Sequence, residues 1–484
     1  MEHSAWEAVI GLEIHVQLNT KSKLFSHAPN HFGDEPNTNI TDVCTGQPGT
    51  LPVLNEEAIK KAVQFGCAVQ AQIPLFSKFD RKSYFYPDSP RNYQITQLDQ
   101  PIILGGMITA KVEGSTKLFS INRAHLEDDA GMLKHFSSFG GVDYNRAGVP
   151  LIEIVSEPCI HTAKEAVAYA TAIKSIMEYL DASDCNMEEG SLRIDANISV
   201  KLKTETALRN KIEIKNMNSF SNMEMAIDAE IHRQIHQYSL HTNTPPEEVI
   251  TPGTYRFDPD KKATVLMRVK ESADDYRYFP EPDLPPIILS KEYIEEIQRT
   301  LPELPSQRLE RYIETLGLSE STAITLINDK PLCDYFEEAI PLCKNSKSLA
   351  NWIMIEFVGR IKDFGKSLKE FGISSKEVAS LVNKIEEGII TGKIAKSVAD
   401  DMVANPLFTC DEIIKNNPDY LPLSDTSSIE KLIDQVLLEN PQSVIDYKAG
   451  KTKAFSFLIG QTMKLCKGAA SPTIVNEMLL KKLS

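Results

Sequence analysis

The sequence predicts an α+β protein in which a β-rich N-terminal part precedes a helical C-terminal part. Up to about residue 286, short runs of alternating apolar and polar residues are separated by Gly, Pro and Asn turns, which is typical of strands with interspersed helices. Residues 278–286 (YFPEPDLPP) then place four prolines within nine residues, and no helix can cross such a segment. Beyond it, apolar residues recur at helical spacing.

The helical part contains several stripes of apolar residues. Ser306 is placed to cap a helix that Gly317 would end, and its stripe includes Leu309 and Tyr312. Similar stripes follow in residues 349–364 and 378–385. A joint is expected at residues 404–408 (ANPLF). We therefore expect three domains: a β-rich domain over residues 1–292, an all-α helical domain over 293–407 and a small, mostly helical C-terminal domain over 408–484.

Composition narrows the class of protein. The 484 residues suffice for about three domains, and 42% hydrophobic with 25% charged residues excludes disordered, collagen-like and coiled-coil chains. The acidic start is unlike a signal peptide, and no run of about 18 uncharged apolar residues predicts a membrane span. The eight scattered cysteines, with no C-x-x-C pair, are typical of reduced thiols. We expect a cytoplasmic enzyme.

The net charge of -15 argues against a uniformly basic nucleic-acid binder, but the charge is distributed unevenly. Residues 451–484 contain six lysines and one acid, so this end carries +5 and residues 1–450 carry -20. Such asymmetry suggests an acidic body with a basic tail that could bind a polyanion. The alternative is a solvated lysine face on a terminal helix.

Acidic side chains alternate with apolar residues along several predicted strands, so that the acids share a face with other polar groups. In residues 12–18 (LEIHVQL), Glu13, His15 and Gln17 point to one side. The same alternation occurs in residues 193–200 (RIDANISV) and 211–215 (KIEIK), whose polar members include Arg193, Asp195, Glu213 and Lys215.

Two further acidic segments extend this set. Glu153 interrupts the apolar run LIEIV, where an unpaired charge would be costly, and residues 125–129 (HLEDD) form an acid cluster. Carboxylates with an imidazole are suitable ligands for Mg²⁺, which often binds substrate phosphates. Bases such as Arg193 and Arg268 could hold those phosphates. The alternative is that each acid simply pairs with a neighbouring base on the exposed face of a one-sided antiparallel sheet.

Familiar nucleotide and nucleophile motifs are missing from the sequence. There is no G-x-G-x-x-G, which excludes a Rossmann site and a kinase glycine loop. Residues 449–452 (AGKT) resemble the end of a phosphate-binding loop, but Ile445 stands where that loop needs glycine. No Ser- or Cys-centred nucleophile motif occurs.

Long segments nevertheless resemble the B subunit of the aspartyl/glutamyl-tRNA amidotransferases, in order and over essentially the whole chain. They include WEAVIGLEIHVQLNTKSKLFS (6–26), YFYPDSPRNYQITQLDQPI (84–102), HLEDDAG (125–131), DYNRAGVPLIEIVSEP (143–158), MEEGSLRIDANIS (187–199), IEIKNMNSF (212–220), DYRYFPEPDLPP (275–286), GKIAK (392–396), DYKAGK (446–451) and GQTMK (460–464).

This resemblance implies a cradle-shaped, β-rich catalytic domain, a helical domain and a tail domain that binds tRNA. It implies that ATP and Mg²⁺ are used to phosphorylate the side-chain carboxylate of Glu-tRNA(Gln) or Asp-tRNA(Asn). Ammonia made from glutamine by a partner, the amidase or A subunit, then displaces the phosphate, and a small C subunit completes the complex. The choice between the two tRNA substrates stays open.

The resemblance also assigns residues. The Mg²⁺ site would comprise Glu13, His15, Glu127, Asp128, Glu153, Asp195 and Glu213, of which Glu13, His15, Asp195 and Glu213 would be catalytic. Phosphate contacts would come from Lys215, Arg193, Arg256 and Arg268, and tRNA contacts in the tail from Lys448, Lys451, Lys453, Lys464 and Lys467.

Two departures from the family pattern stand out. Thr41 occupies the first position of a C-x-x-C in which only Cys44 remains, so the structural zinc of relatives is not expected here. Residues 253–256 read GTYR where relatives tend to have QETR, so only Arg256 is retained.

Two other classes of function fit parts of the same sequence. Acids on a sheet also suit a metal-dependent phosphodiesterase or nuclease, and a basic tail suits a non-catalytic tRNA-binding scaffold. The nature of the product separates an amidotransferase from a nuclease.

Overall fold

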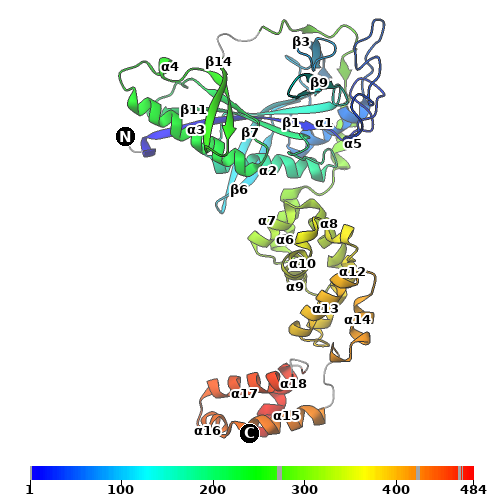
Figure 1. The fold of residues 1–484 in the computed structure, drawn as a ribbon, viewed down its shortest axis with the longest axis vertical. Coiled ribbons are helices and arrows are strands. Elements are labelled where there is room, and N and C mark those ends of the chain that lie inside the picture. The colour runs from blue at the N-terminus through cyan, green and yellow to red at the C-terminus, as the bar shows by residue number, and fades with distance from the viewer. Residues whose placement is uncertain (1–2, 270–274, 421–425, 467–469, 471, 484) are drawn as a thin grey trace. The chain divides into compact units, whose positions relative to one another are not determined.

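The computed structural model describes residues 3–269, 275–420, 426–466, 470 and 472–483. The chain divides into two compact units, residues 1–307 and 308–484. The first is β-rich and the second is helical (Figure 1). The α+β class predicted from the sequence is therefore confirmed, while the domain limits at 292/293 and 407/408 stay predictions. None of the described helices is long and apolar enough to cross a membrane.

The first unit is built on one large sheet. Among the described residues, nine strands form it. In spatial order these are β14 (Ala263–Val269), β13 (Gly253–Asp258), β12 (Ile212–Lys215), β11 (Leu192–Leu202), β1 (Trp6–Gln17), β10 (Pro150–Ser156), β7 (Ser115–Asp128) and β5 (Ile103–Leu104), with β6 (Met107–Val112) also paired to β7. All neighbours are antiparallel except β12 and β13, which run parallel.

Helices cover one face of this sheet (Figure 1). They are α1 (Glu56–Ala68), α2 (Ala163–Tyr179) and α3 (Phe220–Leu240), and α5 (Lys291–Arg299) packs on α1. Asn55, Thr162 and Ser219 cap the first three helices by accepting hydrogen bonds from backbone N–H groups of the first turn. The apolar residues of the central strands, such as Leu12 and Ile14, are fully buried beneath them. The opposite face therefore carries the polar residues, as the alternation predicted.

Shorter elements complete the first unit. They are η1 (His3–Ala5), α4 (Pro246–Val249), the sheet of β15 (Phe279–Pro280), β3 (Asp80–Ser83) and β4 (Tyr93–Thr96), the pair β16 (Ile287–Ile288) and β2 (Phe76–Ser77), and the hairpin of β8 (Met132–His135) and β9 (Gly140–Asp143).

The second unit contains the predicted apolar stripes on successive helices. In chain order these are α6 (Pro305–Glu314), α7 (Glu320–Ile327), α8 (Lys330–Ala339), η2 (Ile340–Leu342), α9 (Ser346–Asn351), the π-helical η3 (Trp352–Phe357), α10 (Val358–Ile361), η4 (Lys362–Phe364), α11 (Leu368–Phe371), α12 (Ser375–Glu386), α13 (Gly392–Ala404), α14 (Cys410–Asn416), η5 (Pro418–Tyr420), α15 (Thr426–Glu439), α16 (Pro441–Lys448), α17 (Thr452–Leu465) and α18 (Pro472–Leu483).

The prediction that Ser306 caps the first of these helices is wrong. Helix α6 begins at Pro305, whose missing N–H is no loss in a first helical turn, so Ser306 lies inside the helix. The predicted stripe is nevertheless correct, because Tyr312 is fully buried. Farther along, residues between Ile429 and Leu483 form a hydrophobic cluster of their own.

Candidate active site

The register of the central strands gathers the predicted acids on the polar face. Between β1 and β10, His15 lies opposite Glu153, and between β1 and β11, Glu13 lies opposite Asp195. The next pairings place Glu153 opposite His125 on β7 and Asn197 opposite Glu213 on β12. Residues from five strands therefore form two neighbouring acidic groups.

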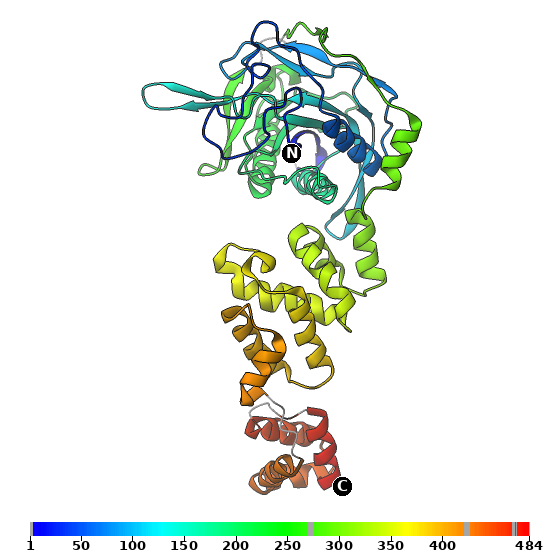
Figure 2. The same cartoon turned by 90° about the vertical axis from the view of Figure 1, so that its right-hand side faces the viewer.

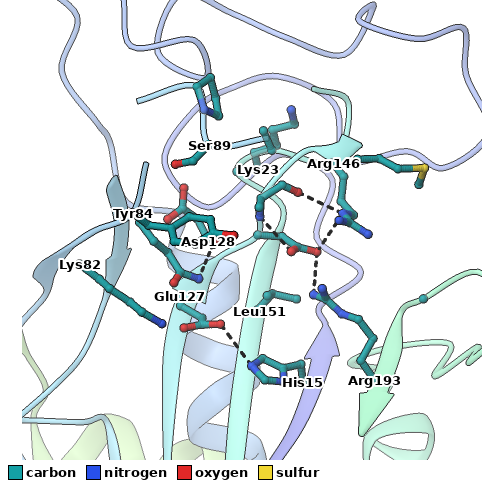
Figure 3. A pocket seen from close by; sticks show the side chains of 18 of the residues that line it. His15, Lys23, Lys82, Tyr84, Ser89, Glu127, Asp128, Arg146, Leu151 and Arg193 are labelled. Atoms are coloured by element: carbon teal, nitrogen blue, oxygen red, sulfur yellow. Dashed lines mark hydrogen bonds and ion pairs between the residues drawn. The ribbon is translucent and has the colours of Figure 1, made fainter. Parts of the chain in front are cut away.

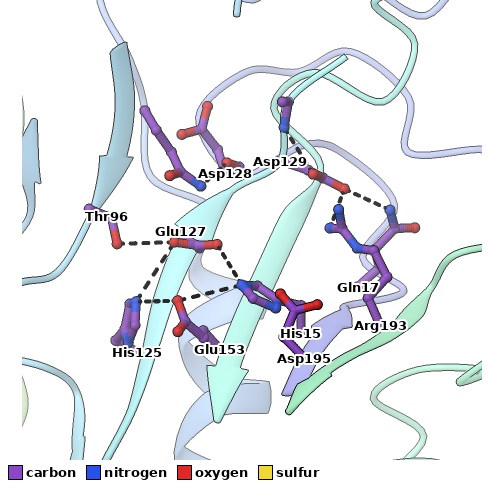
Figure 4. Close-up of polar contacts among 12 residues, drawn as sticks. His15, Gln17, Thr96, His125, Glu127, Asp128, Asp129, Glu153, Arg193 and Asp195 are labelled. Carbon is purple, nitrogen blue, oxygen red and sulfur yellow. Dashed lines mark hydrogen bonds and ion pairs between the residues drawn. The ribbon is translucent and has the colours of Figure 1, made fainter. Parts of the chain in front are cut away.

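The first group consists of His15, Glu127 and Glu153, whose potential ligand atoms lie within 4.8 Å of one another. Figure 4 shows these side chains pointing toward each other from β1, β7 and β10. Nε2 of His15 is 3.6 Å from Oε1 of Glu127 and 3.5 Å from Oε2 of Glu153. Nε2 of the buried His125 is 3.2 Å from the same Glu153 oxygen. Two carboxylates and an imidazole are a ligand set that suits a divalent cation.

The protonation of the two histidines follows from these contacts. Burial alone would lower the pKa of His15, but the hydrogen bond and charge of Glu153 and the charge of Glu127 outweigh it and raise that pKa. In the same way, despite burial, hydrogen bonds to Glu127 and Glu153 raise the pKa of His125 to about 9. Burial also opposes ionisation of Glu153, yet the two imidazoles hold its pKa well below the ordinary value. These contacts therefore favour the protonated form of both imidazoles.

The second group consists of Glu13, Asp195 and Glu213. Lys215 donates to Oδ2 of Asp195 at 2.6 Å, and its Nζ is 3.0 Å from Oε1 of Glu213. Burial, followed by the charges of Glu153, Glu213 and Asp195, raises the pKa of Glu13. One ammonium faces three carboxylates here, so the group retains the excess negative charge that a divalent cation would neutralise.

The three acids of the HLEDD segment contact different partners. Glu127 belongs to the first group, whereas Asp128 lies outside both groups. The Asp128 carboxylate forms an ion pair with Arg91 and accepts the backbone N–H of Ile95 at 2.8 Å. The structure therefore does not bring Asp128 together with the other expected metal ligands, because its oxygens are turned toward Arg91.

Asp129 lies beside two guanidinium groups, those of Arg193 and Arg146, which we call the cationic wall; Figure 4 shows its contact with Arg193. Its Oδ2 accepts hydrogen bonds from Nη2 of Arg193 at 2.8 Å and from Nε2 of Gln17 at 2.9 Å, and Nε of Arg146 lies 3.5 Å away. Although burial opposes ionisation, the two guanidinium groups lower the pKa of Asp129. Asp129 therefore holds Arg193 directly and neutralises only one of the two guanidinium charges, while Arg146 is also held by the carbonyls of Ala130 at 3.0 Å and Gly131 at 2.7 Å.

Both acidic groups and the cationic wall border one cavity of about 840 Å³ (Figure 3). That volume lies within the range of ligand pockets, about 300–1,000 Å³. The charged residues lining the cavity include His15, Lys23, Lys82, Arg91, Glu127, Asp129, Arg146, Arg193, Asp195 and Lys215. The sequence had not singled out Lys23, Lys82, Arg91 or Arg146, although the RNYQ and NRAG segments that contain the two arginines are part of the resemblance.

The other expected phosphate ligands lie farther along the sheet. Arg256 on β13 and Arg268 on β14 are exposed and do not line this cavity. Thr254, two residues before Arg256, donates to Oε2 of Glu213 at 3.1 Å, so this face of β13 is continuous with the second acidic group.

The tail lysines are solvent-exposed where the structure describes them. Lys448, Lys451, Lys453 and Lys464 are all exposed, and Lys451 is paired with Asp446 at 3.1 Å. Lys467 lies outside the described residues.

Cys44, the remaining member of the family's C-x-x-C, lies beside hydroxyl groups. Its Sγ is 3.1 Å from the Ser26 hydroxyl and 3.4 Å from that of Thr41. No cysteine belongs to either acidic group found among the described residues.

Comparison with known proteins defines the class of the β-rich unit and its site. Residues 8–295 match the GatB/GatE catalytic domain family, and residues 334–483 match the GatB domain family. The β-rich unit is therefore a GatB/GatE-type catalytic domain.

Full-length relatives specify the family further. The chain is 67% identical to the B subunit of the aspartyl/glutamyl-tRNA(Asn/Gln) amidotransferase of Protochlamydia amoebophila (strain UWE25), an alignment that covers 100% of this chain and 98% of the relative. It is 58% identical to the B subunit of the same amidotransferase from Chlamydia pneumoniae, with 99% of each chain covered. The chain belongs to the family of aspartyl/glutamyl-tRNA(Asn/Gln) amidotransferase B subunits.

Proposed function

We propose that this chain is the activating and transamidating subunit of a tRNA-dependent amidotransferase. In this reaction ATP activates the side-chain carboxylate of Glu-tRNA(Gln) or Asp-tRNA(Asn), and ammonia then converts it to the amide. The observation that carries the proposal is one cavity lined both by members of the two acidic groups and by the guanidiniums of Arg146 and Arg193. Acids suit divalent cations, and guanidiniums suit phosphates.

Activation is required because a carboxylate is a poor electrophile. A carboxylate oxygen of the substrate attacks the γ-phosphorus of ATP and ADP departs, leaving an acyl phosphate. Ammonia then attacks the acyl carbon, phosphate leaves and a proton is lost, giving the amide. Phosphoryl transfer of this kind depends chiefly on positioning and on stabilisation of charge, so it requires no protein nucleophile.

The residues of the cavity have distinct parts in this scheme. His15, Glu127 and Glu153 would hold one Mg²⁺, and Glu13, Asp195 and Glu213 a second. When bound, Mg²⁺ neutralises charge on the phosphates. Arg193, which donates to Asp129, and the neighbouring Arg146 orient the phosphate chain. Lys215 lines the cavity beside Asp195, where its ammonium can reach a departing phosphate.

The partners follow from the same scheme. The sequence contains no Ser- or Cys-centred nucleophile motif that could release ammonia. The ammonia would therefore come from glutamine through the amidase or A subunit, with the small C subunit in the complex. The tail lysines would bind tRNA, and the complex would work in the cytoplasm. Whether glutamate, aspartate or both substrates are used depends on which misacylated tRNAs the cell supplies.

The test is a reconstituted reaction of the complex with ATP, Mg²⁺, ammonium and Glu-tRNA(Gln) or Asp-tRNA(Asn). We expect phosphate release that requires the misacylated tRNA, together with amidated product. Glu13→Ala and Asp195→Ala should abolish both while tRNA binding persists. Unchanged activity in these variants would refute the metal assignment, and cleaved RNA in place of amidated aminoacyl-tRNA would favour the nuclease alternative.

A further inference from the structure

A hairpin beside the cavity presents two stacked aromatic rings to solvent. Among the described residues, β8 and β9 pair only with each other, and the cyan hairpin stands out from the β-rich unit in Figure 2. Phe136 and Phe139 close its tip with 53% and 63% of their surfaces exposed. Their ring centroids are 4.7 Å apart and their planes differ by 23°.

The sequence of the hairpin favours this exposed pair. A Cβ on Gly141 would lie 3.0 Å from a ring carbon of Phe136, so the glycine leaves space for that ring over the opposite strand. The N–H of Phe136 donates to the carbonyl of Phe139 at 2.9 Å, which closes the tip. Two exposed aromatic rings on a hairpin whose strands, among the described residues, pair only with each other contribute little to the stability of the fold. They are available to bind another molecule.

The base of the hairpin is fixed next to the cavity. The Asn37 side chain donates to the carbonyl of Val142 at 3.0 Å and accepts the N–H of Tyr144 at 2.7 Å. At the other strand, the N–H of Gly131 donates to the carbonyl of Asp88 at 2.8 Å. Met132, the first residue of β8, lines the cavity. The tip is thus presented from an anchored base at the cavity edge.

The exposed polar groups beside the rings suit a nucleic acid. Lys134 and His135 are exposed beside the rings. The acid of the hairpin, Asp143, lies at the base of the hairpin. Its carboxylate accepts hydrogen bonds from the backbone N–H groups of Asn37 at 3.1 Å and Asn145 at 2.9 Å. Flat aromatic faces next to a lysine are the features that bind unpaired nucleotides, since bases stack on the rings and phosphates pair with the cation.

We propose that Phe136 and Phe139 form a stacking platform for the unpaired 3′-terminal nucleotides of the tRNA. This inference rests on the proposed function, which requires an aminoacyl group on the tRNA 3′ end to enter the cavity. The nucleotides next to that group must then lie at the cavity edge. Stacking there orients the end of the tRNA and leaves the chemistry to the residues inside.

The experiment compares the wild-type complex with Phe136→Ala/Phe139→Ala. We expect the KM for Glu-tRNA(Gln) to rise by about tenfold or more, because base–aromatic stacking contributes about 1–3 kcal/mol per base, while the KM for ATP and the kcat stay within about twofold. Phe136→Tyr/Phe139→Tyr should restore the KM. The matched control is Leu118→Ala, which removes a 58% exposed apolar side chain from the β6–β7 hairpin.

A second measurement separates this inference from the proposed function. A tRNA carrying 2-aminopurine near its 3′ end is added to the complex without ATP, and we expect the wild type to quench its fluorescence and the alanine variant not to. Equal quenching and an equal KM in both proteins would overturn the platform. A variant that loses the amidase during gel filtration would instead make the hairpin a protein-docking surface, which also overturns it. Quenching by a wild-type complex that releases no phosphate would retain the platform and refute the proposed function.

Discussion

Glu13 lies directly opposite Asp195 on adjacent strands, only two residues along β1 from the His15–Glu153 pair. Like charges placed opposite each other destabilise a sheet, and the raised pKa of Glu13, caused first by burial and then by neighbouring carboxylates, reflects that cost. The fold tolerates this repulsion at the centre of its largest sheet. Lys215, which contacts Asp195 and Glu213, offsets part of it, and the proposed divalent cations would offset the rest.

We therefore expect each acidic group to hold its own divalent ion. Glu153→Gln should weaken Mn²⁺ binding at the first group by more than about tenfold, and Asp195→Asn should do so at the second, because each change removes a carboxylate ligand. Electron paramagnetic resonance titration of Mn²⁺ measures the two affinities. Glu113→Gln, which alters an exposed carboxylate paired with Lys164, is the control. Loss of both ions in each single variant would show that the groups form one site.

Asp129 should determine how well the enzyme binds ATP. In Asp129→Asn the negative charge that pairs with Arg193 and Arg146 is lost, so Arg193 loses its fixed position, while Arg146 keeps its hydrogen bonds to the carbonyls of Ala130 and Gly131. We expect the KM for ATP to rise by about tenfold or more, with a smaller effect on the KM for tRNA. Breaking such a buried pair also costs up to about 3–5 kcal/mol of stability, so Asp129→Glu is the rescue variant and Glu157→Gln, an exposed partner of Asn122, is the control. An unchanged KM for ATP would contradict the role of Asp129.

The metal-free protein should become less stable as the pH rises from about 6.5 to 9. The pKa of His125 in the folded chain, about 9, lies above its ordinary value of 6.5, because hydrogen bonds to Glu127 and Glu153 outweigh burial. A group whose pKa is raised on folding stabilises the folded chain fully at pH values below its pKa in the unfolded chain. This stabilisation is lost as the pH rises past its pKa in the folded chain. The shift corresponds to at most about 3 kcal/mol.

Fluorescence of Trp6, which is buried in β1, can report this change in a Trp352→Phe background with a chelator present. The denaturation midpoint of the β-rich unit should fall over this pH range in the parent protein and much less in His125→Gln. Equal pH dependence in the two proteins would show that His125 is not responsible.

The tail lysines should contribute to tRNA affinity by neutralising phosphates. Deleting residues after 407, or the change Lys448→Ala/Lys453→Ala/Lys464→Ala, should weaken tRNA binding and reduce the slope of log affinity against log salt by about 1 for each phosphate that is no longer neutralised. Filter binding at several salt concentrations measures that slope. Lys482→Ala is the matched control, since Lys482 pairs with Glu430 and Asp434. An unchanged slope in the triple variant would place the tRNA-binding residues elsewhere.

The sequence could predict which face of the sheet each acid occupies, but not how the acids are divided between the two acidic groups. A period of two in residues 12–18 and 193–200 places Glu13, His15 and Asp195 on the polar side, as the structure has them. The division into two groups depends on the register between strands that lie far apart in the chain, and alternation within one strand carries no information about that register.

The same lack of information about contacts between distant segments explains why the positions of other acids and bases could not be predicted from the sequence. Glu127 and Asp128 are adjacent in β7, and Asp128 is turned away from the acidic groups by its contacts with Arg91 and the backbone N–H of Ile95, neither of which the sequence indicates. Arg256 and Arg268 lie outside the cavity because β13 continues the sheet beyond β12. By contrast, helix periods are local, which is why the stripe around Tyr312 could be predicted even though the first residue of α6 was not.

The central position of β1 has a consequence for synthesis of the chain on the ribosome. Strand β1 ends at Gln17, but its two neighbours in the sheet begin only at Pro150 and Leu192. At about 5–20 residues per second, the nascent strand waits several seconds or longer before either neighbour emerges. During that time its apolar face and its unpaired backbone edges are available to other chains. We expect newly made β1 to be a site for chaperone binding, so that the strand carrying Glu13 and His15 is protected before it is folded.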